Sequence, residues 1–471
     1  MTATLTRSLW SQLVGLERAA VIGRPDDGRL AHEFAALLQR EFVSSGRQSG
    51  EVIGTLSDIR QRYGLGRWAC REAVGILEMR GLLESRRGAG GGLVLSQPTS
   101  NDLAKLMLVH LCLKGARVDQ IIEARRIVHL MVVRKLLSVG RVAFGPREIS
   151  NTAEPSQGFS RWLAAQTANR AFEFLMEFVT ALYDECAADS SNVQAVDERP
   201  LLDAIRRGDD QCASAALDEF LQGTERLQAG EKVVFRRMIA RHALGTSTTH
   251  AARLTQWLLK EIAQRGDSGP MDLGTEAEIG ERHNLNRDTV RRAIRMLEDV
   301  GVVVPKRGRH GGLASREPDL AAVVELMPPL LYQRRISSDA VVEVLRLLKL
   351  EAARLAASRI CRGLASGKVA ALAEQLLRTP PTRPHELIMM ENRLIELTEN
   401  DVLAACDRGL FFCGPVMSPE FTDPVAPHAS LAIANTRVII EAIRAGDVAR
   451  AEAAFMKKMI DLNDRQRTQA A

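Results

Sequence analysis

Two pairs of arginines have the spacing that places both members on one side of a helix. Arg67 and Arg71 are four residues apart, and Arg287 and Arg291 repeat this spacing in the second part of the chain. A guanidinium group can donate two hydrogen bonds to guanine O6 and N7, or it can pair with a phosphate. A single exposed arginine is usually an ordinary solvated charge. Because the same pair occurs twice, we predict that both pairs bind nucleic acid.

The arginines lie inside a long internal repeat. Residues 65–81 (LGRWACREAVGILEMRG) align without gaps with residues 285–301 (LNRDTVRRAIRMLEDVG), and a glycine-rich stretch follows each copy. The offset is 220 residues, and we call two positions that are 220 residues apart, such as 67 and 287, equivalent. The period is too long for a solenoid and matches the length of a whole small protein. The pattern therefore indicates that a complete two-domain unit has been duplicated.

Each copy has the apolar spacing of a helix followed by a helix-turn-helix. The first helix has an apolar face that consists of Leu30, Phe34, Leu37, Leu38 and Phe42 in the first copy and of Leu254, Trp257, Leu258 and Ile262 in the second. The third helix has apolar residues at i, i+3, i+4 and i+7, which are Cys70, Ala73, Val74 and Leu77 in the first copy and Val290, Ala293, Ile294 and Leu297 in the second. We expect this helix to end at Gly81 and Gly301.

Turns and strands complete the predicted module. Residues 64–66 and 284–286 contain Gly or Asn, which suit a tight turn between two helices. Residues 82–86 and 302–306 have the pattern of a strand, and residues 93–95 close a hairpin in the first copy. A helix, a helix-turn-helix and a β-hairpin together make up a winged helix-turn-helix.

The remaining segments predict helical bundles. Long amphipathic patterns run from Val118 to Leu137 and from Ser338 to Ile360. We therefore expect a mainly α fold, in which two winged helix-turn-helix domains, each with a small β-hairpin wing, alternate with two all-helical bundle domains. The expected segments are an N-terminal segment at 1–25, the first winged helix-turn-helix at 26–97, the first helical effector-like domain at 98–228, a linker helix with the second winged helix-turn-helix at 229–317, and the second helical effector-like domain at 318–471.

The arginine-containing segments resemble the GntR family of bacterial transcription regulators. The family pattern runs roughly L-P-[ST]-E-x-x-L-A-x-x-x-x-V-S-R-x-x-V-R-E-A-L-x-x-L-x-x-x-G-L, and a glycine-containing wing follows it. Both arginines, the alanine two residues after the second arginine and the final glycine match in each copy. The resemblance implies that DNA is contacted by Arg67, Arg71 and Gly88 in the first copy and by Arg287, Arg291 and Gly308 in the second.

The candidate DNA-binding residues combine the helix and the wing. The N-terminal residues of such a helix face base edges in the major groove, and wing glycines let the backbone approach DNA closely. The full set is Arg67, Trp68, Arg71, Arg87 and Gly88 in the first copy and Asn286, Arg287, Thr289, Arg291, Arg307 and Gly308 in the second. Because the two recognition helices are not identical, we expect two half-sites that differ.

The helical segments are similar to the effector domain in the FadR-like branch of that family, since both contain an Ala-Ile-x-x-Gly-Asp turn. The branch often binds a divalent metal through imidazole and carboxylate ligands. The expected histidine position falls near Ser160 in one half and near Glu391 in the other, so we predict no metal and no cofactor. Arg125 and Arg126 are candidates for binding a small organic acid, and the alternative is that they are solvated or salt-bridged.

The composition excludes other classes. Hydrophobic residues make up 46% and the net charge is +5, so the chain can build cores and is mildly basic. The seven cysteines form no C-x2-C pair, which predicts reduced thiols in a cytoplasmic protein. We find neither a signal peptide nor an apolar run that would span a membrane. Because no phosphate loop, nucleophile elbow or metal cluster is present, we predict that the chain is not an enzyme.

The sequence therefore predicts a transcription regulator whose partner is double-stranded DNA. Its two helix-turn-helix modules would act as a built-in pseudo-dimer on an asymmetric or pseudo-palindromic operator. The alternative is a metabolite-sensing or protein-interaction regulator in which one module has degenerated. The operator, the effector and the association of two chains into a homo-oligomer stay open at this point.

Overall fold

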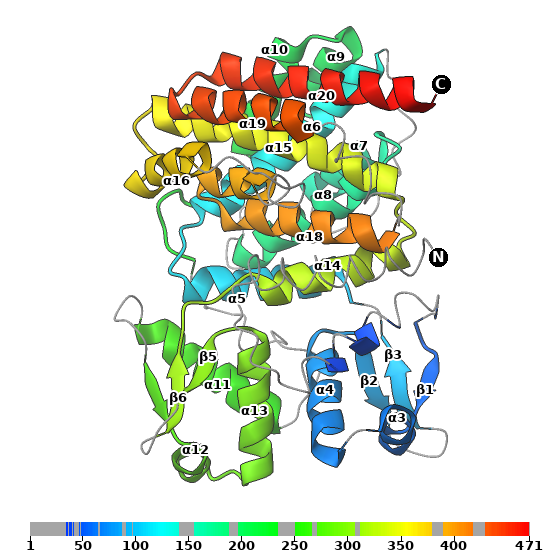
Figure 1. The fold of residues 1–471 in the computed structure, drawn as a ribbon, viewed down its shortest axis with the longest axis vertical. Helices are drawn as coiled ribbons and strands as arrows, with labels where there is room; N and C mark the ends of the chain where they lie inside the picture. Colours follow the sequence, from blue (N-terminus) through cyan, green and yellow to red (C-terminus); the bar gives the residue numbers. More distant parts are fainter. Residues whose placement is uncertain are drawn as a thin grey trace.

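The computed structural model is mainly helical and contains two small antiparallel sheets, as the sequence predicted (Figure 1). Among the residues that the structure describes, no helix is both long enough and apolar enough to cross a lipid bilayer. The described residues are 34, 35, 37–39, 41, 47, 49–64, 66–86, 91–96, 98–140, 155–187, 196–233, 250–265, 271–306, 311–378, 390–417 and 429–470.

The first sheet and the helices beside it form what we call the first module, residues 49–96. Its elements are β1 (Val52–Gly54), α3 (Leu56–Tyr63), α4 (Arg67–Met79), β2 (Leu83–Arg86) and β3 (Gly92–Leu95). The three antiparallel strands have the order β1-β3-β2, so a strand from ahead of the helices extends the hairpin. This arrangement is consistent with a winged helix-turn-helix. The sequence pattern did not predict β1.

The second module, residues 250–315, repeats the first. Its elements are α11 (His250–Arg265), β4 (Asp272–Gly274), α12 (Glu276–His283), α13 (Arg287–Asp299), β5 (Val303–Lys306) and β6 (Gly312–Ser315). The strand order is β4-β6-β5. Leu83 pairs with Leu95 in the first sheet, and Val303 pairs with Ser315 in the second, so equivalent positions pair in the same register. The repeat in the sequence is therefore also a repeat of backbone pairing.

Capping boxes begin the second helix of both modules. Thr55 Oγ1 accepts a hydrogen bond from the backbone N–H of Asp58, and the Asp58 carboxylate accepts one from the N–H of Thr55 at 2.7 Å. Thr275 and Glu278 form the same reciprocal pair at the start of α12. Each box satisfies N–H groups that a helix leaves without partners in its first turn.

Residues with a left-handed backbone conformation follow the helices at equivalent positions of the two modules. The φ angle is 64° at Gly64 and 50° at Asn284, in the turn ahead of α4 and α13. It is 69° at Gly81 and 78° at Gly301, directly after these helices. Glycine and asparagine adopt this conformation more readily than other residues. The predicted turns and helix ends are therefore confirmed.

The third helix buries the face that its spacing predicted. In the first module this face is at most 5% exposed, and in the second at most 4%, for the set Cys70, Ala73, Val74 and Leu77 and the set Val290, Ala293, Ile294 and Leu297. Helix α4 packs against α3 and β2, and α13 packs against α11, α12 and β5, so these side chains belong to the hydrophobic core.

The helical residues 34, 35 and 37–39, which precede the first module, and their counterpart α11 each correct one residue of the predicted apolar face. Leu37 is 47% exposed and its counterpart Trp257 is 48% exposed, although both were predicted to be buried. Phe34, Ala35 and Leu38 are buried instead. These three centre the buried face about 100° away from Leu37 on a helix with 3.6 residues per turn. The remaining predicted members of the first-copy face, Leu30 and Phe42, lie outside the described residues.

Two sets of helices, which we call the first and second halves, account for the remaining elements. The first half contains α5 (Ser100–Leu113), α6 (Asp119–Val139), α7 (Pro155–Ala165), α8 (Arg170–Ala187), α9 (Arg199–Arg207) and α10 (Asp210–Gly223). The second half contains α14 (Ala321–Gln333), α15 (Ser338–Cys361), α16 (Gly367–Arg378), the 3-10 helix η1 (Leu394–Thr398), α18 (Asp401–Met417), α19 (Ala429–Arg444) and α20 (Val448–Ala470). The two long helices predicted from the sequence correspond to α6 and α15.

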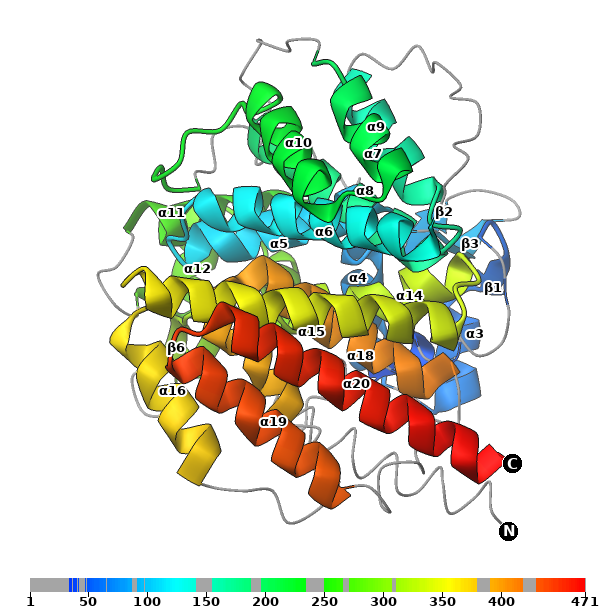
Figure 2. The same cartoon turned by 90° about the horizontal axis from the view of Figure 1, so that it is seen from above.

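The modules and the halves occupy opposite ends of the molecule. In Figure 1 both modules lie at the lower end, α5 and α14 cross directly above them, and the other helices stack on top. Viewed from above, α6 and α15 run side by side through the middle (Figure 2). The helices α9 and α10 lie on one side of this pair, and α16, α19 and α20 lie on the other. The two halves are therefore joined along their longest helices.

Candidate nucleic-acid interface

Helices α4 and α13 pack against each other and carry the two arginine pairs. Their Cα atoms approach within 8 Å, and Arg292 lies beside Gly75, where an added Cβ would be 3.9 Å from Arg292 Cγ. Figure 1 shows the two helices side by side, with the preceding helices α3 and α12 toward the end away from the halves. The N-terminal turns that contain Arg67 and Arg287 therefore face the same end of the molecule.

In the second module, one carboxylate contacts both arginines. Glu276 is the first residue of α12, and its Oε2 accepts hydrogen bonds from Arg291 Nε at 2.9 Å and from Arg287 Nε at 3.3 Å. The side chains of Arg287 and Arg291 remain 72% and 40% exposed. Because these contacts use the Nε atoms, the Nη atoms of each guanidinium group still have N–H donors for other partners. They can contact a base edge or a phosphate.

In the first module, Leu56 stands at the position of Glu276. Arg67 is exposed and Arg71 is half-buried. Within the part of the chain that the structure describes, neither arginine forms an ion pair. Among the described residues, the first pair therefore has no compensating carboxylate, whereas the second pair shares one negative charge.

The residue ahead of each recognition helix also differs. The Oδ1 of Asn286 accepts a hydrogen bond from the backbone N–H of Thr289 at 2.9 Å and thereby caps α13. Gly66 occupies the same position ahead of α4 and makes no side-chain cap. The sequence predicted that Asn286 and Thr289 contact DNA. The structure gives Asn286 a capping role, and the contact of both residues with DNA stays a prediction.

A groove of about 1040 Å³ runs between α12, α13 and the hairpin β5–β6. Its wall includes Asn286, Arg287, Arg291 and Arg295 from the recognition helix and Gly312 from the hairpin. The groove thus joins the two parts of the module, helix and wing, that the sequence predicted to contact DNA.

Several predicted contacts lie outside the described residues. These are Arg87 and Gly88 in the first hairpin and Arg307 and Gly308 in the second. Trp68 belongs to α4, and its side chain likewise lies outside the described part of the chain. The roles predicted for these residues stay predictions.

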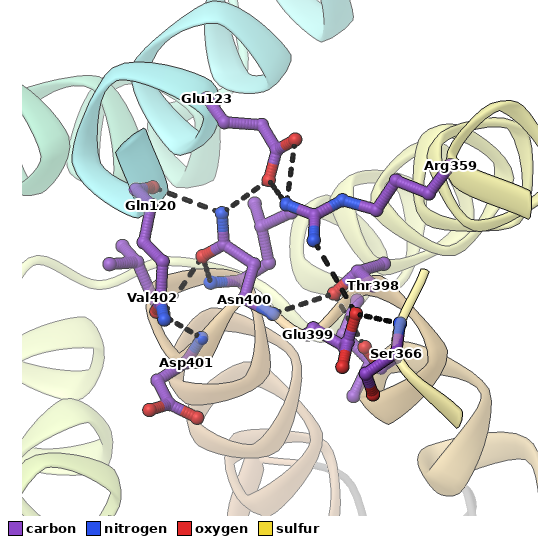
Figure 3. Close-up of polar contacts among 11 residues, drawn as sticks. Gln120, Glu123, Arg359, Ser366, Thr398, Glu399, Asn400, Asp401 and Val402 are labelled. Carbon is purple, nitrogen blue, oxygen red and sulfur yellow. Dashed lines mark hydrogen bonds and ion pairs between the residues drawn. The ribbon is translucent and has the colours of Figure 1, made fainter. Parts of the chain in front are cut away.

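Two asparagines join the first half to the second in the same way. Asn400 Nδ2 donates to Glu123 Oε2 at 2.8 Å and to a backbone carbonyl of α6 at 3.0 Å (Figure 3). Asn169 Nδ2 donates to Glu343 Oε2 at 2.8 Å and to a backbone carbonyl of α15 at 3.1 Å. The two glutamates occupy equivalent positions of the sequence repeat. Each half therefore donates one asparagine to the other, as in the isologous interface of a symmetric dimer.

Ion pairs reinforce this joint. Arg359 of the second half pairs with Glu123 of the first at 2.8 Å, as Figure 3 shows. Lys135 of the first half pairs with Glu343 of the second. The same two glutamates thus receive an asparagine and a cation from the opposite half. These contacts could not be predicted from the sequence, because the residues that form them are more than 200 positions apart.

A four-residue charge network lies further along the same joint. Arg134 contacts Glu351 at 2.9 Å and Glu452 at 3.4 Å, and Arg354 contacts the same carboxylates at 3.8 and 2.8 Å. Glu351 is 1% exposed. Burial raises the pKa of Glu351 to about 7, although the charge of Arg134 acts in the opposite direction. The network connects α6 of the first half with α15 and α20 of the second.

The first module is attached to the second half by a buried ion pair. Arg80, directly after α4, is 3% exposed and donates to Glu325 of α14 at 2.7 Å. It also donates to Gln39 at 2.8 Å. The residues at the positions equivalent to Arg80 and Glu325 are Val300 and Lys105, which cannot form such a pair. The second module is therefore attached differently.

The two arginines predicted to bind an organic acid have different surroundings. Arg126 forms two hydrogen bonds with Asp218, at 2.6 and 2.8 Å, which is the salt-bridged alternative. Arg125 is buried, lies over the ring of Tyr183 and donates to Thr224 Oγ1 at 2.7 Å. Burial lowers the pKa of Arg125. Neither arginine lines either of the two cavities described here.

The second cavity, of about 530 Å³, lies between α5, α16 and α18. Its wall includes Lys114, Asp401 and Lys368. Burial opposes ionisation of Asp401, but the hydrogen bond from His110 and the charge of Lys114 lower its pKa to about 2. The sequence did not predict this cavity, because its residues come from both halves.

The positions expected for metal-binding histidines have other partners. Ser160 lies 2.9 Å from His129 Nε2, and burial lowers the pKa of His129 to about 3. Glu391 pairs with Lys458. Among the described residues, no three His, Cys, Asp or Glu side chains gather as a metal site would require. The absence of a metal from the protein stays a prediction.

No protein-family model matches the chain, and no curated protein sequence matches it. Among solved structures, the chain is similar to a Streptococcus agalactiae GntR, at 20% sequence identity and a TM-score of 0.32. The similarity covers 45% of this chain and 99% of that chain. At this level of similarity, the function has to be inferred from the residues of the chain itself.

Proposed function

We propose that the chain is a sequence-specific, GntR-like DNA-binding transcription regulator. In this proposal, two winged helix-turn-helix domains alternate with two helical bundle domains, at the boundaries expected from the sequence. The observation that carries it is the arginine pair on the N-terminal part of α4, repeated on α13 at the same end of the molecule. In a helix-turn-helix, this part of the second helix contacts base edges in the major groove of double-stranded DNA.

The two modules act as a built-in pseudo-dimer. The paired asparagines between the halves support this, because each half gives the other the same contact. Separate dimer modules commonly bind half-sites about 34 Å apart, one turn of DNA. Helices of 13 residues are about 20 Å long, and α4 and α13 lie in contact. We therefore infer two adjoining half-sites, less than one turn apart and different in sequence.

The test is DNA binding by full-length variants. DNA is first selected from a random library with the wild-type chain, and affinity is then measured by fluorescence anisotropy for Arg67→Ala, Arg287→Ala and the double variant. Each single change should weaken binding to the selected DNA by about fivefold or more, since an arginine contact with a base contributes about 1–3 kcal/mol and a lost phosphate contact also lowers affinity. Arg199→Ala, at an exposed arginine on α9, should bind as the wild type does. Wild-type specific binding by the double variant would refute the proposal.

A small organic acid is the effector class that Arg125 would suit. Its Nη1 atom is buried without a hydrogen-bond partner in the described part of the chain. A carboxylate is the natural partner of such a donor. Melting temperatures measured with a panel of mono- and dicarboxylates should rise for at least one compound, and Arg125→Met should abolish the rise. A panel that shifts no wild-type melting temperature would contradict this part of the proposal.

A second candidate function is a metabolite-sensing or protein-interaction regulator whose first module has degenerated. Two observations favour it: Gly66 gives α4 no side-chain cap, and Leu56 provides no carboxylate for the arginines. The dependence of DNA affinity on salt separates the candidates. If both modules bind DNA, the variant Arg67→Ala with Arg71→Ala has a shallower salt dependence than the wild type. An unchanged slope would favour the second candidate.

A further inference from the structure

The two modules have one backbone and different surroundings for their arginines. We propose that Glu276 is a positioning residue that makes the second module the sequence-selective one. The first module, with Leu56 at that position, binds chiefly DNA phosphates. This inference rests on the proposed function and divides the work of DNA binding between the modules.

Glu276 is held in place by its own helix. The residue ahead of it, Thr275, forms the capping box with Glu278, so the backbone at the start of α12 is fixed. The carboxylate is 34% exposed and reaches both arginines from there. An arginine that must contact a base edge through two Nη donors loses less conformational freedom on binding when its Nε is already held. Glu276 thus preorganises two guanidinium groups at once.

The charge balance separates the modules further. Arg287, Arg291 and Glu276 together carry a net charge of about +1, whereas Arg67 and Arg71 carry about +2. Affinity for phosphates depends on the positive charge that displaces counterions from DNA. The first module therefore has the stronger sequence-independent attraction, and the second has the better-oriented donors.

The N-cap of α13 also supports a more rigid second module. Asn286 fixes the first turn of α13 through the backbone N–H of Thr289, while Gly66 leaves the first turn of α4 without a side-chain cap. Both the helix start and the arginines that it carries are therefore held in the second module. Neither is held in this manner in the first.

The experiment exchanges the two residues in the full-length chain. Glu276→Leu should flatten the base preference in one half-site, with the ratio of specific to non-specific affinity falling about tenfold. Because a negative charge is lost, its log–log salt slope should steepen by about 1. Leu56→Glu should make the slope shallower by about 1 and leave the selectivity of the second half-site unchanged. Binding-site selection and anisotropy at several salt concentrations measure both quantities, and melting temperatures verify folding.

Glu281→Leu is the matched control, because it removes the same charge from the same helix and the structure records no contact between Glu281 and either arginine. If Glu276→Leu and Glu281→Leu give the same half-site preference and the same salt slope, the inference is wrong. That result would leave the proposed function intact as long as the wild type binds specific DNA. A wild-type chain without specific binding would overturn the proposed function and the inference with it.

Discussion

The two modules share helix order, strand register and turn conformations at equivalent positions of the repeat, yet they differ at three positions beside the arginines or on the helices that carry them. The second module has Glu276, Asn286 and Arg295 at the positions where the first module has Leu56, Gly66 and Gly75, respectively. The shared features are those that hold the backbone together. The differing features are those that would face DNA or the other module.

In the proposed pseudo-dimer, this difference would allow the two modules to be asymmetric. In a homodimer, a change on one recognition helix appears on both. In a duplicated chain, Gly75 of α4 can lie beside Arg292 of α13 while Arg295 occupies the equivalent position of α13.

The largest difference between the modules should be their attachment to the halves. Arg80→Met removes one member of a buried ion pair and leaves Glu325 and Gln39 without it. Breaking a buried pair from one side typically costs about 3–5 kcal/mol. We expect the free energy of unfolding of the first module to fall by about that amount, and hydrogen exchange to speed up in β1–β3 and α4. The second module should exchange as before.

Two further variants sharpen this prediction. Lys105→Ala changes the counterpart of Glu325 and should alter stability by less than about 0.5 kcal/mol. Arg80→Met combined with Glu325→Leu should recover part of the loss, since no buried charge is then left alone. Equal hydrogen exchange in both modules after Arg80→Met would show that this ion pair does not secure the first module in particular.

The halves differ as well, because α15 has Glu351 at the position where α6 has Met131. Burial raises the pKa of Glu351 to about 7 from its ordinary value of 4.5. Between these values the folded chain keeps a proton that the unfolded chain releases, so the free energy of unfolding should decrease as the pH rises from 4.5 to 7. A full shift of this size corresponds to about 3 kcal/mol.

Glu351→Gln should remove this contribution. We expect the variant to be close to the wild type at pH 5 and more stable than it at pH 8, because an amide is not ionised at either pH. Urea unfolding at several pH values measures the difference. Parallel stability curves for the two chains would show that Glu351 does not titrate in this range.

The parts of the fold that sequence could predict depend on nearby residues. The helix-turn-helix followed from the apolar spacing of α4 and α13, and its turns from Gly64 and Asn284, because both signals lie within one or two helical turns. The strands β1 and β4 have three residues each, too few for an alternating pattern to be visible. Leu37 looked like a core residue because the edge of an apolar face cannot be located from spacing alone.

Contacts between distant segments were the least predictable part of the candidate site. The arginines were found from their repetition, but the contact of α4 with α13 and the reciprocal contacts of Asn169 and Asn400 depend on how the two copies pack. Glu276 had a local signal, since it lies 11 residues before Arg287 in the sequence. This spacing alone does not show that one carboxylate contacts both arginines, and the difference between Glu276 and Leu56 has a meaning only with that contact.

The smallest difference that we expect to measure is the cap on the recognition helix. Gly66 has φ and ψ of −64° and 150°, almost the values of −71° and 156° at Asn286, and no atom of the described residues lies within 4 Å of a Cβ added there. Gly66→Asn should therefore create the missing cap and also restrict the unfolded chain, raising the free energy of unfolding of the first module by about 0.5–1 kcal/mol. Asn286→Gly should lower that of the second module by a similar amount. Because the two changes exchange the caps, hydrogen exchange in α4 and α13 should change in opposite directions. Destabilisation by Gly66→Asn would mean that α4 needs the glycine for a reason other than its backbone conformation.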